Sequence, residues 1–225
     1  MNLPLVDDYI DIHNHGASSV NGIFSVENIT ADEERVPDES PGVTYTIGIH
    51  PWHVTVKNFH EQLKKVILFS RHSNVIALGE AGFDRIKGPD FSLQKEIFEK
   101  QVIIAEEVKK PIYIHCVKAW EELLSARKLL KPQMPWLVHG FRGKNELAMQ
   151  LISKGMYISF WFDFVMKPES SQLIKSLPVN RIFLETDGGG IEIIKIYEKV
   201  SADLNMTVNQ LKSQLYSNFK NFFGV

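Results

Sequence analysis

The stretch YIDIHNH (residues 9–15) decides the fold, because it is a short β-branched run that ends in side chains suited to metal binding. Residues i and i+2 of a β-strand lie on the same face, so His13 and His15 point to one side if the strand continues through them. A lone His-x-His pair usually means two polar residues on an edge strand. The rest of the chain has to show whether other strands end in the same way.

Short apolar runs alternate with longer segments of helical spacing along almost the whole chain. The expected strands are residues 9–13, 22–26, 44–50, 75–80, 111–115, 136–139, 155–160 and 181–187. The expected helices are residues 59–72, 92–109, 119–130, 144–154, 168–177 and 207–223. Thr207, with Gln210 three residues later, predicts a capping box at the start of the last helix. This alternation predicts a mainly parallel sheet, open or closed.

Residues 30–42 (TADEERVPDESPG) interrupt the alternation at a place where a regular barrel has a helix. The segment is acidic and holds two prolines, which favour irregular backbone. We therefore predict a surface loop here.

The composition is that of an ordinary globular protein, with 44% apolar and 23% charged residues in 225. This length suits one α/β barrel, so we expect a single domain over residues 1–225. The net charge of −2 provides no overall attraction for nucleic acid. If the substrate carries phosphate, the positive charge has to come from a local patch or from bound metal.

Several features predict a cytoplasmic protein. Cys116 is the only cysteine, which excludes an internal disulfide and fits a reducing compartment. The first residues, MNLPLVDDY, have neither the basic segment nor the apolar core of a signal peptide. No apolar run approaches the roughly 20 residues that cross a bilayer. We expect no membrane association and no obligate protein partner.

Side chains that bind metals stand at the ends of six of the expected strands. They are His13, His15, His50, Glu80, His115, His139 and Asp187. The strand ends of a parallel barrel open onto one rim, where active sites are built. Imidazole with carboxylate suits zinc, manganese, iron or magnesium. So many ligands suit a pair of ions about 3.5–4 Å apart, with one carboxylate bridging them and a second acid serving the attacking water.

The stretches that carry these residues resemble the TatD-like metal-dependent hydrolases, a deoxyribonuclease family of the amidohydrolase-type barrels. In the family's order they are DIHNH (11–15), GIHPWH (48–53), GEAGFD (79–84), PIYIHC (111–116), VHGFRG (138–143), YISF (157–160), ETDGG (185–189) and SNFKNFFG (217–224). The resemblance implies a TIM-type (β/α)8 barrel. The short distance between the first two stretches predicts that it is distorted and shortened between the first and third strands.

The resemblance also implies two divalent metal ions, whether Zn, Mg or Mn. Glu80 is expected to bridge both ions and Asp187 to serve the attacking water, so these two acids are the expected catalytic residues. Asp11 is expected to steady the strand or a ligand rather than to bind metal. The expected ligands are His13, His15 and Asp187 for the first ion, His115 and His139 for the second, and Glu80 for both.

Four further residues are expected to bind substrate. His50 should contact a phosphate oxygen, and Trp52 is a candidate for stacking against a base, with His53 beside it. The family's usual His-Cys-Arg is here His-Cys-Val (residues 115–117), and an arginine appears instead at Arg142. Arg142 either takes over the phosphate contact or is a surface residue over a helix start.

Two other segments allow more than one interpretation. Residues 188–190 are three glycines, after which we expect a helix to begin quickly. The glycines either let a ligand approach closely or make a tight turn, and we favour the turn. The shortened loop should leave the site more open. The aromatic residues Trp161, Phe162 and Phe164 either stack bases or pack beneath a loop, and we favour packing.

The function that we predict is metal-dependent hydrolysis of DNA phosphodiester bonds, as a 3′ to 5′ exonuclease on single strands or 3′ ends. An alternative enzyme function on the same barrel is hydrolysis of a small phosphate ester or amide. A third alternative is a non-catalytic metal- or nucleic-acid-binding protein. The presence of both Glu80 and Asp187 argues against this third function.

Overall fold

The order of the strands in the sheet follows the order of the chain. The computed structural model describes residues 2–16 and 18–225, and its eight strands form one sheet in the order β1 to β8. The strands are β1 (Tyr9–Asn14), β2 (Ile23–Thr30), β3 (Val43–Gly48), β4 (Val75–Asp84), β5 (Ile112–Val117), β6 (Trp136–Val138), β7 (Tyr157–Trp161) and β8 (Ile182–Glu185). The pairs β1–β2, β3–β4, β4–β5, β5–β6 and β7–β8 are parallel.

Helices separate the strands from β3 onward. They are α1 (Phe59–Phe69), α2 (Phe91–Val108), α3 (Trp120–Leu130), α4 (Asn145–Ser153), α5 (Phe162–Val165), α6 (Pro168–Ser176), the 3₁₀ helix η1 (Val179–Arg181), α7 (Ile193–Asp203) and α8 (Val208–Phe223). Among the described residues no helix lies between β1 and β3, and residues 31–42 are irregular. This strand order with these helices confirms the predicted TIM-type (β/α)8 class, including its shortening between the first and third strands.

The structure differs from the sequence-based elements mainly in length. Strand β2 continues to Thr30 and β4 continues to Asp84, several residues past their expected ends. Helix α5 and the 3₁₀ helix η1 were not expected, because each is too short for a periodic pattern. The predicted capping box is confirmed, since Thr207 and Gln210 exchange side-chain and backbone hydrogen bonds at the start of α8. None of the helices in the described parts of the chain is long and apolar enough to cross a membrane.

The described residues form two compact units. Unit 1 comprises residues 28–38 and 45–138, and unit 2 comprises residues 2–27, 39–44 and 139–225. The single domain expected over residues 1–225 stays a prediction.

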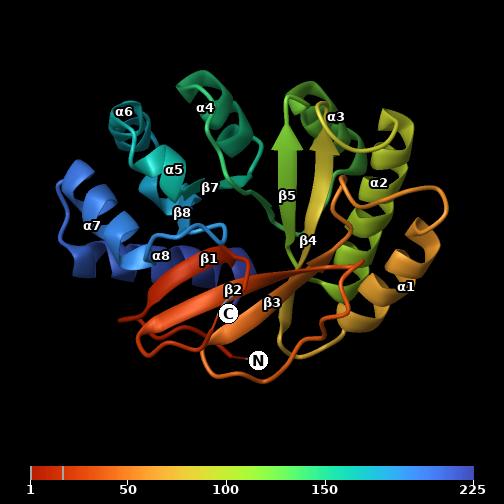
Figure 1. Ribbon diagram of the computed structural model, residues 1–225. Helices are drawn as coiled ribbons and strands as arrows, with labels where there is room; N and C mark the ends of the chain where they lie inside the picture. The colour runs from red at the N-terminus through yellow and green to blue at the C-terminus, as the bar shows by residue number, and fades with distance from the viewer. Residues whose placement is uncertain (1, 17) are drawn as a thin grey trace. The chain divides into compact units, whose positions relative to one another are not determined.

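Unit 1 is built around the parallel pair β4–β5, beside which α2 and α3 lie in Figure 1. Gly82 pairs with His115 at a very close approach of the two strands, because a Cβ at Gly82 would collide with the carbonyl oxygen of His115. Helix α2 packs against β4 and buries Ile97 and Phe98. It begins at Asp90, whose side chain accepts a hydrogen bond of 2.8 Å from the Ser92 N–H.

Unit 2 is held together by a tyrosine of α7 that bonds to the backbone of β1. The Tyr197 hydroxyl accepts a hydrogen bond of 3.0 Å from the Ile10 N–H and donates one of 3.1 Å to the Ile10 carbonyl oxygen. Tyr197 and Ile10 are both fully buried. Burial raises the pKa of the Tyr197 hydroxyl, which therefore stays protonated and able to donate. This contact fixes the strand that carries His13.

We expect Tyr197→Phe to lower the free energy of unfolding by about 1–3 kcal/mol, because it leaves two buried backbone groups of β1 unsatisfied. Urea denaturation of the metal-free protein, followed by circular dichroism, measures the change. Tyr216→Phe, on a partly exposed face of α8, is the control and should have little effect. Equal stability of the wild type and Tyr197→Phe would contradict the importance of this contact.

Candidate metal centre

The end of β1 and the residues after β8 bring three predicted ligands together in unit 2. The Oδ1 atom of Asp187 lies 3.5 Å from His13 Nε2 and 3.5 Å from His15 Nε2. The nitrogen and oxygen atoms of these three side chains all lie within 4.8 Å of one another. His13 is fully buried, whereas the side chain of His15 is 41% exposed and that of Asp187 24%. The group is thus anchored inside the unit and open on one side.

The backbone of Asp187 has an unusual conformation that aims its carboxylate at the histidines. Its φ angle is +51°, in the left-handed region that non-glycine residues seldom adopt. The Asp187 N–H donates a hydrogen bond of 3.1 Å to the His13 carbonyl oxygen. The following Gly188 also has a positive φ, of +67°. Such backbone strain is concentrated at functional sites, where neighbouring structure compensates for its cost.

Asp11 fastens the end of β8 to β1, as expected for a residue that steadies the strand. Its carboxylate accepts hydrogen bonds of 2.9 Å from the Thr186 N–H and 2.6 Å from the Thr186 hydroxyl. The Asn14 side chain donates a third, of 2.7 Å. Burial raises the pKa of the Asp11 carboxyl to about 6, against these hydrogen bonds, which lower it. The bonds place Asp187, the next residue after Thr186, beside His13.

His139 also lies in this group of unit 2. Its ring centroid is 4.5 Å from that of His13, and its Nδ1 atom is 3.6 Å from the Oε1 atom of Glu185. Glu185 is fully buried and accepts hydrogen bonds of 2.7 Å from the Gly140 N–H and 2.5 Å from the Ser159 hydroxyl. Sequence analysis missed Glu185 as a site residue. Strand alternation offered a signal, because Glu185 lies two residues before Asp187 in the strand expected over residues 181–187 and would share its face there.

Unit 1 holds a second group of three side chains, His50, Glu80 and His115. Glu80 Oε1 lies 3.7 Å from His50 Nε2 and 3.5 Å from His115 Nδ1, and these two nitrogens are 3.2 Å apart. All three residues are buried. His50 was expected to contact substrate only, yet its ring lies among the expected ligands.

An asparagine of β2 holds Glu80 in place. Asn28 Oδ1 accepts a hydrogen bond of 2.9 Å from the Glu80 N–H, and Asn28 Nδ2 donates one of 3.3 Å to Glu80 Oε2. The Thr46 hydroxyl donates a further bond of 2.7 Å to Asn28 Oδ1. Asn28 is fully buried and was not identified from the sequence, because the strand expected over residues 22–26 ended before it.

Asp84, at the end of β4, is a further buried acid of unit 1 that sequence analysis did not select. Its Oδ2 atom lies 2.6 Å from the Trp52 indole nitrogen and 3.1 Å from His115 Nε2. Burial acts to raise the pKa of the Asp84 carboxyl. Hydrogen bonds from the Lys87 N–H, the Trp52 indole and His115 outweigh it and hold the pKa below its usual value. The carboxylate is therefore ionised at neutral pH.

The donor atoms of both groups are spaced as a metal ion requires. A tetrahedral ion with bonds of about 2.0–2.2 Å holds its ligand atoms about 3.3–3.6 Å apart. The separations of 3.5 Å around Asp187 Oδ1 match this spacing and are too long for good hydrogen bonds. Imidazole nitrogen and carboxylate oxygen are the donors that zinc and manganese accept. The residues present thus fit a divalent cation.

The remaining predicted substrate residues have partners within the protein. His53 Nδ1 lies 2.7 Å from an oxygen of Asp32, and both side chains are exposed. The Trp52 ring is 42% exposed, with Lys87 Nζ 4.0 Å above its centroid. In unit 2, the Arg142 guanidinium lies 4.9 Å above the Trp161 ring. The substrate-binding roles of these residues stay predictions.

The glycine segment after Asp187 forms a tight turn, the interpretation that we favoured. The Gly189 N–H donates a hydrogen bond of 2.8 Å to the Thr186 carbonyl oxygen. A Cβ at Gly189 would collide with the Phe162 ring, so this position packs against α5. Phe164, on the same helix, is buried and stacks on Phe160 at 5.8 Å. These contacts agree with packing as the role of Phe162 and Phe164.

Cys116 follows His115 but is unsuited to metal binding or nucleophilic chemistry at neutral pH. Burial raises the pKa of its thiol to about 12, so only a trace of thiolate is present. This agrees with a metal centre made of imidazole and carboxylate alone.

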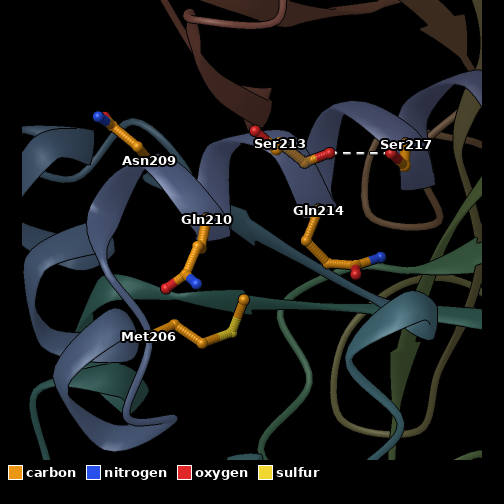
Figure 2. Close-up of a pocket in the computed structure, with 6 residues that line it drawn as sticks. All are labelled: Met206, Asn209, Gln210, Ser213, Gln214 and Ser217. Atoms are coloured by element: carbon orange, nitrogen blue, oxygen red, sulfur yellow. Dashed lines mark hydrogen bonds between the residues drawn. The ribbon is translucent and has the colours of Figure 1, made fainter.

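A surface depression on α8 of unit 2 is unrelated to these groups. It has a volume of about 460 Å³ and is drawn in Figure 2. The Ser217 hydroxyl donates a hydrogen bond of 2.9 Å to the Ser213 carbonyl oxygen across one end of it. Its lining residues are Met206, Asn209, Gln210, Ser213, Gln214 and Ser217. None of these six residues can titrate near neutral pH, and we assign the depression no catalytic role.

Comparison with known proteins identifies relatives over nearly the whole chain. The sequence profile described as "TatD related DNase" matches residues 12–224. A metal-dependent hydrolase of Buchnera aphidicola is 28% identical over 211 residues, which cover 81% of this chain and 78% of that protein. A 3′-5′ ssDNA/RNA exonuclease TatD of Citrobacter koseri is 30% identical over 149 residues, which cover 63% of this chain and 56% of that protein.

Solved structures confirm the fold. A TatD family hydrolase of Entamoeba histolytica superposes with a TM-score of 0.78, covers 99% of both chains and shares 18% sequence identity. A TatD homologue of Escherichia coli K12 superposes with the same TM-score of 0.78, covers 98% of this chain and 100% of that one, and is also 18% identical. At this identity, the superpositions establish the fold alone.

Proposed function

The chain belongs to the TatD-related DNase family, and from this premise we propose that it cleaves DNA phosphodiester bonds with two divalent metal ions. Membership confirms the predicted family and the predicted enzyme class, a metal-dependent hydrolase that acts on ester bonds. The observation that carries the proposal is the position of Asp187 Oδ1, 3.5 Å from both His13 Nε2 and His15 Nε2.

We assign the first ion to His13, His15 and Asp187, whose spacing supports it. We assign the second ion to His115 and His139, with Glu80 as a ligand of both ions. This second assignment follows the family resemblance. The two ions are Zn, Mg or Mn.

Divalent ions in such a ligand set polarise a phosphoryl oxygen and lower the pKa of water toward about 7. The chain's own residues supply proton transfer and orientation. Asp187 is partly exposed, so its carboxylate is accessible to a water molecule and can accept the proton that the water loses. His50 Nδ1 accepts a hydrogen bond of 3.1 Å from the Trp52 N–H, so the neutral ring carries its proton on Nε2. His50 Nε2 is thus a donor for a phosphate oxygen.

In the proposed reaction the water oxygen attacks the phosphorus atom and the bond between phosphorus and the 3′ oxygen breaks. The carboxylate of Asp187 takes the proton of the water, and the departing 3′ oxygen takes one from solvent. The products are a 5′-mononucleotide and a strand shortened by one residue with a free 3′ hydroxyl. This polarity and a preference for single strands agree with the name of the Citrobacter koseri relative.

The exposed face of unit 1 offers contacts for a nucleotide. Trp52 presents a half-exposed ring on which a base can stack, at about 1–3 kcal/mol. Lys87 Nζ, 4.0 Å above that ring, supplies a positive charge for a neighbouring phosphate. We therefore propose Trp52 and Lys87 as substrate contacts beside His50. The cytoplasmic location inferred from the sequence stays a prediction.

We expect Glu80→Ala and Asp187→Asn each to reduce DNA cleavage by about three orders of magnitude or more, because each removes a proposed ligand and Asp187→Asn also removes the proton acceptor. A single-stranded oligonucleotide with a 5′ label, incubated with Mn²⁺ or Mg²⁺, measures the rate. The wild type should shorten it stepwise from the 3′ end.

Glu99→Ala on α2 is the matched control and should cleave at the wild-type rate. Undiminished cleavage by either Glu80→Ala or Asp187→Asn would contradict the proposed mechanism. A wild type that leaves DNA intact but hydrolyses p-nitrophenyl phosphate esters would favour the small-substrate alternative. Metal binding without hydrolysis of any ester would favour a non-catalytic protein.

We expect Arg142→Ala to raise the KM for single-stranded DNA about 10-fold with little change in kcat, because a charge-assisted phosphate contact contributes about 1.5–3 kcal/mol. Steady-state kinetics with an oligonucleotide substrate measure both constants. Arg181→Ala is the control, since Arg181 also lies over an aromatic ring, 4.8 Å from that of Tyr157. An unchanged KM in Arg142→Ala would show that Arg142 is only a surface residue.

A further inference from the structure

The expected ligand His115 takes part in a chain of hydrogen bonds in unit 1 whose direction can be derived. Both carboxylate oxygens of Asp84 accept hydrogen bonds from groups that can only donate, namely the Trp52 indole and two backbone N–H groups, so His115 Nε2, 3.1 Å from Asp84 Oδ2, must carry a proton and donate it. In the neutral ring, the lone pair then lies on His115 Nδ1. This nitrogen faces Glu80 Oε1 at 3.5 Å and His50 Nε2 at 3.2 Å.

The other end of the chain of hydrogen bonds gives the same direction. A backbone N–H can only donate, and that of Trp52 donates to His50 Nδ1, so the proton of the neutral His50 ring lies on Nε2. In the absence of a cation, His50 Nε2 therefore donates to His115 Nδ1. A cation that takes this lone pair would release the His50 proton for a phosphate oxygen. Both ends independently require the tautomer of His115 with its proton on Nε2 and its lone pair on Nδ1.

The surroundings of Asp84 hold its carboxylate rigidly. Its Oδ1 atom accepts hydrogen bonds of 2.7 Å from the Ile86 N–H and 2.9 Å from the Lys87 N–H. Its own N–H donates one of 2.8 Å to Gln94 Oε1, and Gln94 Nε2 donates one of 3.0 Å to the Asp84 carbonyl oxygen. Asp84 is only 2% exposed. The oxygen that meets His115 thus has one fixed position.

We propose that Asp84 is a positioning residue that sets the tautomer and ring orientation of His115, so that Nδ1 is ready to bind a divalent cation beside Glu80. The same oxygen accepts the Trp52 indole N–H at 2.6 Å, so Asp84 also fixes the ring that we propose as a base platform. A carboxylate behind a ligating histidine orients the ring and raises its basicity, and its loss typically lowers metal affinity 10–100-fold. This inference rests on the proposed function only in taking His115 as a metal ligand.

The replacement Asp84→Asn tests the inference because the amide can place a hydrogen-bond donor where the carboxylate has an acceptor. If the new side chain keeps its oxygen on the Ile86 and Lys87 N–H groups, its NH₂ group faces His115 Nε2. That nitrogen must then accept, and the proton moves to Nδ1, where it blocks the lone pair. We expect two-dimensional ¹H–¹⁵N NMR of the metal-free protein to show His115 protonated on Nε2 in the wild type and on Nδ1 in Asp84→Asn. The imidazole signal that disappears from the spectrum of His115→Gln is the signal of His115.

Isothermal titration with Zn²⁺ is the second readout. We expect Asp84→Asn to bind the more weakly held of its two Zn²⁺ ions with an affinity about 10–100-fold lower than that of the wild type. Two variants serve as controls. Asp90→Asn alters an exposed cap of α2 and should change neither readout. Trp52→Phe removes the other donor to Asp84 Oδ2 and should leave the His115 tautomer unchanged.

Wild-type His115 protonated on Nδ1 would overturn the inference, even if Asp84→Asn failed to fold. An Asp84→Asn variant with the wild-type tautomer and affinity would overturn it as well. Failure of the proposed function is a separate result. If the wild type binds Zn²⁺ and cleaves no DNA, while Asp84→Asn shows the tautomer change, the role of Asp84 stands and only the nuclease proposal is removed.

Discussion

The hydrogen bonds that the Asp11 carboxylate accepts from Thr186 are the contact on which the metal-binding geometry of unit 2 depends. They join the end of β8 to β1 and leave Asp187, the next residue, in a left-handed conformation with its N–H bonded to the His13 carbonyl oxygen. His13 of β1 and His15, just after the end of that strand, then lie at equal distance from one oxygen atom of an acid that is far away in the sequence. Tyr197, bonded to both backbone groups of Ile10, holds the same strand from the other side.

Both units place carboxylates where water is largely excluded and then satisfy them with fixed donors. Glu185 receives the Gly140 N–H and the Ser159 hydroxyl, while Asn28 bonds to both the backbone and the side chain of Glu80. A buried carboxylate without such partners would lower the stability of the folded protein and would tend to be protonated. These partners keep the acids oriented. The oxygens left facing the histidines are those that a cation would meet.

The fold and much of the candidate site could be predicted from the sequence because strand alternation is a local signal. His13, His15 and Asp187 were all expected at strand ends, and the structure places them together. The ordered motifs also predicted the family. A two-residue period shows which side chains share a face of a strand. The family motifs predicted the barrel in which the strand ends meet.

The supporting residues could not be predicted, because hydrogen-bond partners depend on tertiary position. Asp84 lies within the stretch GEAGFD, but a strand expected to end at Glu80 does not indicate that Asp84 belongs to it, and the structure extends β4 to Asp84. Asn28 lies beyond residue 26, where the strand was expected to end, and only the structure shows that β2 includes it. His50 was expected to contact substrate, and only the structure shows its ring beside His115 and Glu80.

The central claim is that these histidines and acids hold divalent cations, and anomalous diffraction from crystals soaked in Zn²⁺ tests it most directly. The account predicts a peak with bonds of about 2.0–2.2 Å to the side chains of His13, His15 and Asp187. It predicts a second peak bonded to Glu80 and to Nδ1 of His115. Crystals of active protein with no peak beside His13, His15 and Asp187 would contradict the account.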